Sequence, residues 1–175
     1  MRSNQQMANL LADADVTGLS ARDIPPMFRE IAERGWSVTE SGARVLTDLR
    51  SDEGRSYFDR LAEETTVNGR GMTDYDLPLD AAGERTNVLL RRSLAYIAAC
   101  LRAAEQEFGD GQVLAYLSLS LGGTDDDLLT AHVTFCRPLP DTPPYIADLE
   151  QVRDAAVAEI SVEDCPAPSD HGLRS

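Results

Sequence analysis

Lysine is absent from this chain of 175 residues, so all 16 basic residues are arginines. A phosphate-binding P-loop needs the lysine of its Gly-x-x-x-x-Gly-Lys motif, and Schiff-base catalysis needs a lysine amine. Both are therefore excluded. The sequence also lacks the Gly-x-Gly-x-x-Gly, Gly-x-Ser-x-Gly and His-Glu-x-x-His motifs of dinucleotide-binding proteins, serine hydrolases and zinc proteases.

Cysteine is scarce, because Cys100, Cys136 and Cys165 lie far apart and form no Cys-x-x-Cys pair. Neither a disulfide scaffold nor a zinc–thiolate site is expected, and no motif predicts another metal or a cofactor. No apolar run approaches the roughly 20 residues of a membrane span, and the first residues lack the apolar core of a secretory signal. We therefore expect a cytoplasmic protein without a membrane partner.

The charge is distributed unevenly along the chain, whose net charge is −14. Residues 103–175 hold 3 arginines and 14 acidic residues, whereas residues 1–102 hold 13 arginines and 16 acidic residues. A GC-rich genome or adaptation to salt explains the missing lysines, but genome bias gives no reason for the uneven placement. An acidic chain with a pI of 4.4 repels the nucleic-acid backbone, so nucleic acid is not an expected partner.

The chain is long enough for one globular core, which we expect to span residues 1–162 as a single domain, with a flexible tail over 163–175. The strongest helix signal covers residues 87–108, where apolar side chains recur every three or four positions. Capping and proline signals predict further helices over residues 4–14, between Asp23 and Gly35, over 39–48, from Ser51 onward, and over 143–160.

Alternating apolar residues over 113–121 and 129–135 predict a β-hairpin. Matching parity requires Leu121 to pair with Leu129, which places Ser118 opposite His132 on the second face of the sheet. A further strand is predicted over residues 72–79, at an edge, because Pro78 cannot donate to a neighbour. The expected fold is α+β, with several helices packed on a small antiparallel sheet that contains the 113–136 hairpin.

Three residue groups are candidates for chemistry. Ser118 and His132 would form a nucleophile–base pair if a carboxylate oriented the imidazole, but no elbow or oxyanion motif accompanies them. Asp74 and Asp76 share a strand face and would present oxygens to a divalent cation. An anion would suit the arginines that open the long helix, which are Arg85, Arg91 and Arg92. We assign no catalytic residue and no metal ligand.

The predicted interaction surface is the hairpin loop, where Asp125, Asp126 and Asp127 are consecutive. An acidic surface attracts a basic partner and speeds their encounter. The sequence therefore predicts an acidic protein-binding module, either an inhibitor of the immunity-protein type or an adaptor subunit, that docks on a basic protein. The alternatives are a small enzyme, with an aspartate-bound metal or a small-molecule site on the polar sheet face, and a structural subunit that forms a homo-oligomer.

Overall fold

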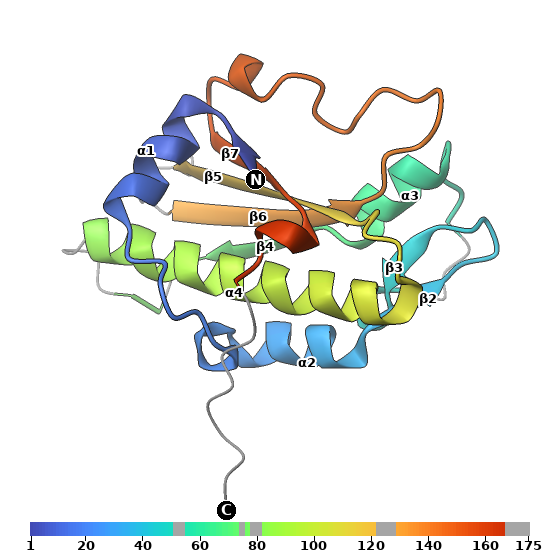
Figure 1. Ribbon diagram of the computed structural model, residues 1–175, viewed down its shortest axis with the longest axis horizontal. Coiled ribbons are helices and arrows are strands. Elements are labelled where there is room, and N and C mark those ends of the chain that lie inside the picture. The colour runs from blue at the N-terminus through green and yellow to red at the C-terminus, as the bar shows by residue number, and fades with distance from the viewer. Residues whose placement is uncertain (51–54, 74–75, 78–81, 122–128, 167–175) are drawn as a thin grey trace, which may run out of the picture.

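A five-stranded antiparallel sheet forms the centre of the computed structural model, which describes residues 1–50, 55–73, 76–77, 82–121 and 129–166 (Figure 1). The strands follow the order β1-β7-β5-β6-β4. They are β1 (Arg2–Ser3), β4 (Arg70–Thr73), β5 (Leu114–Leu121), β6 (Leu129–Cys136) and β7 (Ala156–Ile160). A separate hairpin joins β2 (Trp36–Val38) to β3 (Arg44–Leu46).

The described helices are α1 (Gln5–Asp13), α2 (Pro26–Arg34), α3 (Arg60–Val67) and α4 (Ala82–Phe108). Four short 3-10 turns accompany them, namely η1 (Ala21–Asp23), η2 (Thr47–Leu49), η3 (Leu149–Gln151) and η4 (Val162–Asp164). Figure 1 shows α4 running along one face of the sheet, with α2 against its outer side. The predicted α+β class is confirmed, and so are the helices α1, α2 and α4.

The central β5–β6 hairpin has the predicted register. Leu121 pairs with Leu129, Leu117 with Val133 and Ser118 with His132. Because side chains alternate along a strand, this register turns Ala115, Leu117 and Leu119 of β5 and Ala131, Val133 and Phe135 of β6 toward α4. The core between these layers contains Leu117, Val133 and Phe135 from the hairpin and Tyr96 and Leu101 from α4.

The helix predicted over residues 39–48 is wrong, because β2 and β3 form a hairpin there. Gly42 adopts a φ of 83°, which a side-chain-bearing residue rarely does and which turns the chain back on itself. Thr39 accepts a hydrogen bond from the Ala43 amide within this turn, at 3.2 Å. Its hydroxyl therefore stabilises the turn of a hairpin instead of the start of a helix.

The helix predicted over residues 143–160 is also wrong. Only the single turn η3 is helical there, and residues 156–160 form β7 between β1 and β5. Ala156, Ala158 and Ile160 point into the core at strand spacing. The free edge of β5 needs hydrogen-bond partners, and β7 supplies them.

Two other predicted elements differ from the structure in their extent. The edge strand predicted over 72–79 does lie at the edge of the sheet, but β4 begins at Arg70 and ends at Thr73. Residues 74–75 and 78–79 lie outside the described residues. The helix predicted to begin near Ser51 starts instead at Arg60, where the Asp59 carboxylate accepts from the Ala62 amide at 2.7 Å.

Two buried polar side chains, one in α3 and one directly after it, tie that helix to its neighbours. Glu64 accepts hydrogen bonds from the backbone amides of Arg44 and Arg137, both at 2.8 Å, and from the guanidinium of Arg137. Asn68 accepts from the Leu46 amide and donates to the carbonyls of Arg44 and Phe135. These two side chains therefore satisfy backbone groups of β3 and of the end of β6 that have no backbone partner there.

The Tyr96 hydroxyl is buried in the core and makes no standard hydrogen bond within the described part of the chain. Burial, with a smaller effect from the Cys100 thiol, raises its pKa. Because an unsatisfied buried hydroxyl is unfavourable, we expect Tyr96→Phe to increase the free energy of unfolding by about 1 kcal/mol. Chemical denaturation measures this change, and a clear loss of stability would contradict the assignment.

Tyr116→Phe is the matched control for this experiment. The Tyr116 hydroxyl donates to the Glu159 carboxylate at 2.9 Å, so the same change of one oxygen removes a real hydrogen bond. We expect it to lower the free energy of unfolding by about 1 kcal/mol, opposite in sign to Tyr96→Phe.

Candidate functional site

The face of the sheet opposite α4 is polar at its centre. Strand alternation places on it, from β5, β6 and β7, the residues Tyr116, Ser118, Ser120, Thr130, His132, Thr134 and Glu159. We call these residues the polar sheet face. The segment that joins β6 to β7 crosses this face. It covers one end of the face and leaves the other end open.

The covered end of the polar sheet face centres on Tyr116, whose ring meets Tyr145 edge to face at a centroid distance of 5.0 Å. The Glu159 carboxylate accepts from the Tyr116 hydroxyl and also pairs with Arg2, at 3.0 Å. Burial and the neighbouring Glu159 raise the pKa of the Tyr116 hydroxyl, which remains protonated. Thr134 is also covered, because it donates to the Thr65 carbonyl of α3.

The open end of the polar sheet face holds Ser118 and His132. They are directly opposed across β5 and β6, as predicted, but no hydrogen bond joins them and no described carboxylate hydrogen-bonds the imidazole. A Cβ added to Gly69 would lie 3.2 Å from the His132 Nε2 atom, so the ring packs closely against α3 and β4. Desolvation lowers the His132 pKa and keeps the ring neutral near pH 7. The pair lacks the orienting group of a catalytic triad.

A long connector joins β6 to β7 on the far side of the sheet from α4, shown in orange in Figure 1. We call residues 138–155 the connector. Its 18 residues carry four acidic residues, one arginine and four prolines. Apart from the turn η3, it contains no helix or strand. Loops of this length are uncommon in small domains and are usually functional or disordered, and this one has a defined path.

Several bonds hold the connector in place. Arg137 precedes it and is bound by Glu64, while Leu149, the first residue of η3, is buried. At its far end, the Asn4 amide group donates to the carbonyls of Val152 and Ala155, at 3.1 and 2.9 Å. The connector is therefore anchored at both ends and in the middle.

The outer side of the connector is acidic and carries one exposed aromatic ring. Tyr145 is 43% exposed although its ring packs on Tyr116. Asp141, at a φ of 61°, is the single non-glycine residue with positive φ among the described residues. Asp148, Glu150 and Asp154 are exposed as well. We call Asp141, Tyr145, Asp148, Glu150 and Asp154 the connector surface.

Many acids of the second half of the chain already have partners. Six of the ten that the structure describes accept hydrogen bonds, and these are Glu105, Asp110, Asp148, Glu150, Glu159 and Asp164. Cations neutralise only three of the six, through Arg44–Asp110, Arg2–Glu159 and the Met1 amino group with Asp164. The carboxylates of Asp141 and Asp154 accept no bond from the described residues, so both are available to an outside partner.

The predicted interaction residues Asp125, Asp126 and Asp127 lie outside the described residues, as does Asp74. Asp76 is described, and the guanidinium of Arg92 occupies its carboxylate through two hydrogen bonds. The pKa of Asp76 is lowered as a result.

Arg91 also forms an ion pair within the chain, with Asp23. Within the described ranges, no three histidine, cysteine or acidic side chains gather as metal ligands would.

The helix predicted over 143–160 left no place for the connector surface. A signal was present, since Pro138, Pro140, Pro143 and Pro144 fall within seven residues and disfavour regular structure. The acidic residues that follow these prolines entered the predicted acidic binding module only through the net charge of the chain. These acidic residues lie on one surface because of the path of the connector, and the pairing of β7 determines that path.

By fold the chain is a single α+β domain whose polar sheet face is crossed by an acidic connector. No protein-family model, no curated protein and no solved structure matches it in comparison. In the described part of the chain, no helix has both the length and the apolar character needed to cross a membrane.

Proposed function

We propose that this protein is an acidic protein-binding module that docks on a basic partner protein in the cytoplasm. Its action is that of an inhibitor of the immunity-protein type or of an adaptor subunit, in which binding itself is the function. The connector surface provides the docking site, and the predicted loop residues Asp125, Asp126 and Asp127 add to the same negative charge.

The observation that carries this proposal is the anchored, outward-facing connector with its acids and Tyr145. Protein interfaces favour an aromatic residue surrounded by polar groups, and tyrosine is among the residues that contribute most to binding. Charges around the ring steer the encounter and select partners of opposite sign. The carboxylates of Asp141 and Asp154 remain unneutralised by described cations. A basic partner could therefore form ion pairs with both without displacing a described cation.

The proposal predicts a partner that depends on the connector surface. We would use the whole chain as bait in a lysate of the organism that encodes it, at low salt, and identify captured proteins by mass spectrometry. The test variant combines Asp141→Asn, Glu150→Gln and Asp154→Asn. Asparagine tolerates the positive φ of position 141, so the connector should keep its path.

The matched control combines Glu30→Gln, Glu33→Gln and Glu84→Gln. These residues are exposed on α2 and α4, and their substitution also removes three negative charges. Exposed ion pairs are worth about 0.5 kcal/mol each, so three of them should change the dissociation constant about tenfold. We expect this loss for the connector variant and not for the control. Raised salt should weaken binding of the unmodified chain, because ions screen exposed charges.

Three results would contradict the proposal. Equal binding by both triple variants would show that net charge acts without a defined surface. Salt-independent capture would show that the partner is not held by charge. A chain that captures no basic protein and has twice its expected mass in size-exclusion chromatography would favour the assembly-subunit alternative.

A further inference from the structure

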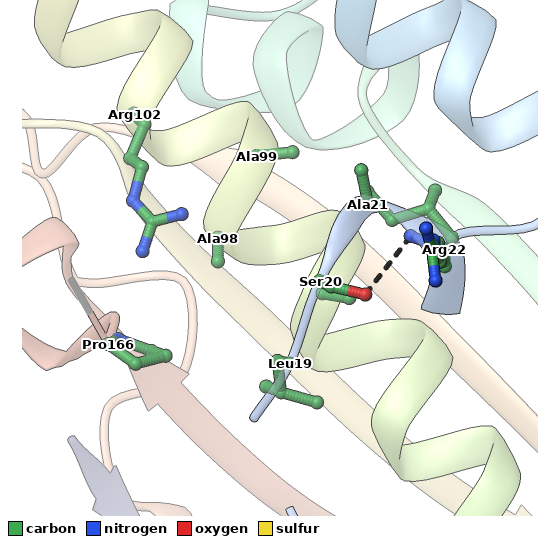
Figure 2. A pocket seen from close by; sticks show the side chains of 10 residues that line it. Leu19, Ser20, Ala21, Arg22, Ala98, Ala99, Arg102 and Pro166 are labelled. Carbon is green, nitrogen blue, oxygen red and sulfur yellow. Dashed lines mark hydrogen bonds between the residues drawn. The ribbon is translucent and has the colours of Figure 1, made fainter. Parts of the chain in front are cut away.

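A groove lies between α4 and the segment that contains η1 (Figure 2). Figure 1 shows α4 and the connector on opposite sides of the sheet. Its volume is about 520 Å³, within the range of small-molecule sites. The α4 wall consists of Ala95, Ala98 and Ala99, and the opposite wall includes Leu19 and Ile24. The three alanines share one side of α4, so their small side chains leave the space that larger residues would fill.

Hydrogen bonds and an ion pair bind the outer wall of the groove to α4. Arg91 donates to the carbonyls of Asp15 and Thr17, both at 2.8 Å, and pairs with the Asp23 carboxylate at 3.0 Å. Ser20 and Asp23 also form a reciprocal capping box that fixes η1. A pre-formed apolar site avoids the entropic cost of ordering its walls when a ligand binds.

Positive charge lies at both ends of this apolar groove. Figure 2 shows the Arg102 guanidinium beside Ala98 and above Pro166, with Arg22 at the opposite side of the view. Neither arginine forms an ion pair with any described carboxylate. The neighbouring acid of η4, Asp164, is bound by the Met1 amino group and the Ser161 amide. In a chain with nearly twice as many acids as arginines, the described residues leave these two cations unneutralised beside an apolar wall.

We propose that the groove binds an amphipathic carboxylate, a small molecule with one anionic head and an apolar body. The carboxylate accepts charge-assisted hydrogen bonds from Arg102, and the apolar body lies along Ala95, Ala98 and Ala99. Guanidinium and carboxylate match in geometry as well as in charge. This site is separate from the proposed protein-binding surface, because α4 and the sheet lie between them.

Isothermal titration calorimetry with decanoate tests the proposal on the full chain, below the concentration at which decanoate aggregates. The comparison ligands are 1-decanol and decylammonium, which have the same apolar body with a neutral or a cationic head. We expect decanoate to bind at least about tenfold more tightly than either, because a hydrogen bond to a charged group is worth about that factor. Octanoate should bind roughly tenfold more weakly than decanoate, since it buries two fewer methylenes.

Variants locate the site. Arg102→Gln should weaken decanoate binding about tenfold and leave 1-decanol unchanged, because only the head group loses its partner. Ala99→Leu should remove binding of both ligands by filling the groove. Arg34→Gln changes an exposed arginine at the end of α2 and should leave binding unchanged. Thermal unfolding of each variant checks that it remains folded.

The proposal is overturned if decanoate produces no binding heat, or if 1-decanol and decylammonium bind as tightly as decanoate. Unchanged binding in folded Arg102→Gln would overturn the assignment of the head group. Residues 167–175 follow Pro166 and lie outside the described residues. If decanoate binds only after their deletion, the groove belongs to the chain's own C-terminal segment, and that result also overturns the proposal.

Discussion

Replacing Glu64 with alanine is expected to lower the free energy of unfolding by about 3–5 kcal/mol, the loss typical of a broken buried ion pair. The Glu64 carboxylate is fully buried and is the acceptor for two backbone amides and for the Arg137 guanidinium. Alanine would leave those donors without an acceptor in a place that water does not reach. Urea denaturation followed by circular dichroism measures the change.

The backbone amides make this carboxylate hard to replace. Many buried ion pairs can be exchanged for two apolar residues at little cost. Here the combined variant Glu64→Leu with Arg137→Leu would remove both charges but would still leave the amides of Arg44 and Arg137 unsatisfied. We therefore expect the double variant to remain destabilised by about 2 kcal/mol or more, since each unsatisfied buried donor costs about 1–3 kcal/mol.

Glu63→Ala is the control on the same helix. Glu63 accepts a hydrogen bond from the exposed Ser41 hydroxyl, and exposed polar contacts contribute less than about 1 kcal/mol. A loss for Glu64→Ala no larger than that for Glu63→Ala would mean that the buried network does not exist as described. The same experiment bears on function, because Arg137 directly precedes the connector and Glu64 fixes its position.

The fold could be predicted from sequence where local pattern and tertiary need agree. The β5–β6 hairpin is such a case, because period-two alternation and matching parity are enough to pair Ser118 with His132. The long helix is another, since its apolar stripe continues unbroken to Phe108. In both elements the residues that alternate or recur are the ones that the core buries.

Prediction failed where the deciding interaction is distant in sequence. The stripe of Ile146, Leu149, Val152 and Ala156 suits a helix, yet strand β7 forms because β5 offers an unpaired edge about 40 residues earlier. Asn4 reinforces β7 by accepting from the Val157 amide at 3.0 Å, a contact that no local pattern shows.

The same reason explains what sequence could not show about the sites. The connector surface depends on the return of β7 to the sheet, and the groove depends on the η1 segment, which Arg91 binds to α4 and whose Ile24 is buried in the core. Charge composition did predict an acidic protein. It did not show that Arg102 and Arg22 would lie beside an apolar wall without an ion pair to any described carboxylate.

The second large effect concerns Phe135, at the centre of the core. Its fully buried ring meets Trp36 and Tyr96 edge to face, at centroid distances of 5.7 and 5.8 Å. Phe135→Ala removes both contacts and opens a cavity between the sheet and α4. We expect the free energy of unfolding to fall by about 3–5 kcal/mol, as for other buried phenylalanines. Equilibrium denaturation with guanidinium chloride measures this loss.

The chain contains a control in which the same atoms are deleted in water. Phe58 is 98% exposed, so Phe58→Ala should change the free energy of unfolding by no more than about 0.5 kcal/mol. The difference between the two variants measures burial without the chemical difference between phenylalanine and alanine. Equal losses in the two variants would mean that Phe135 is not in the core. The hairpin register that places Ser118 and His132 on the polar sheet face would then be wrong as well.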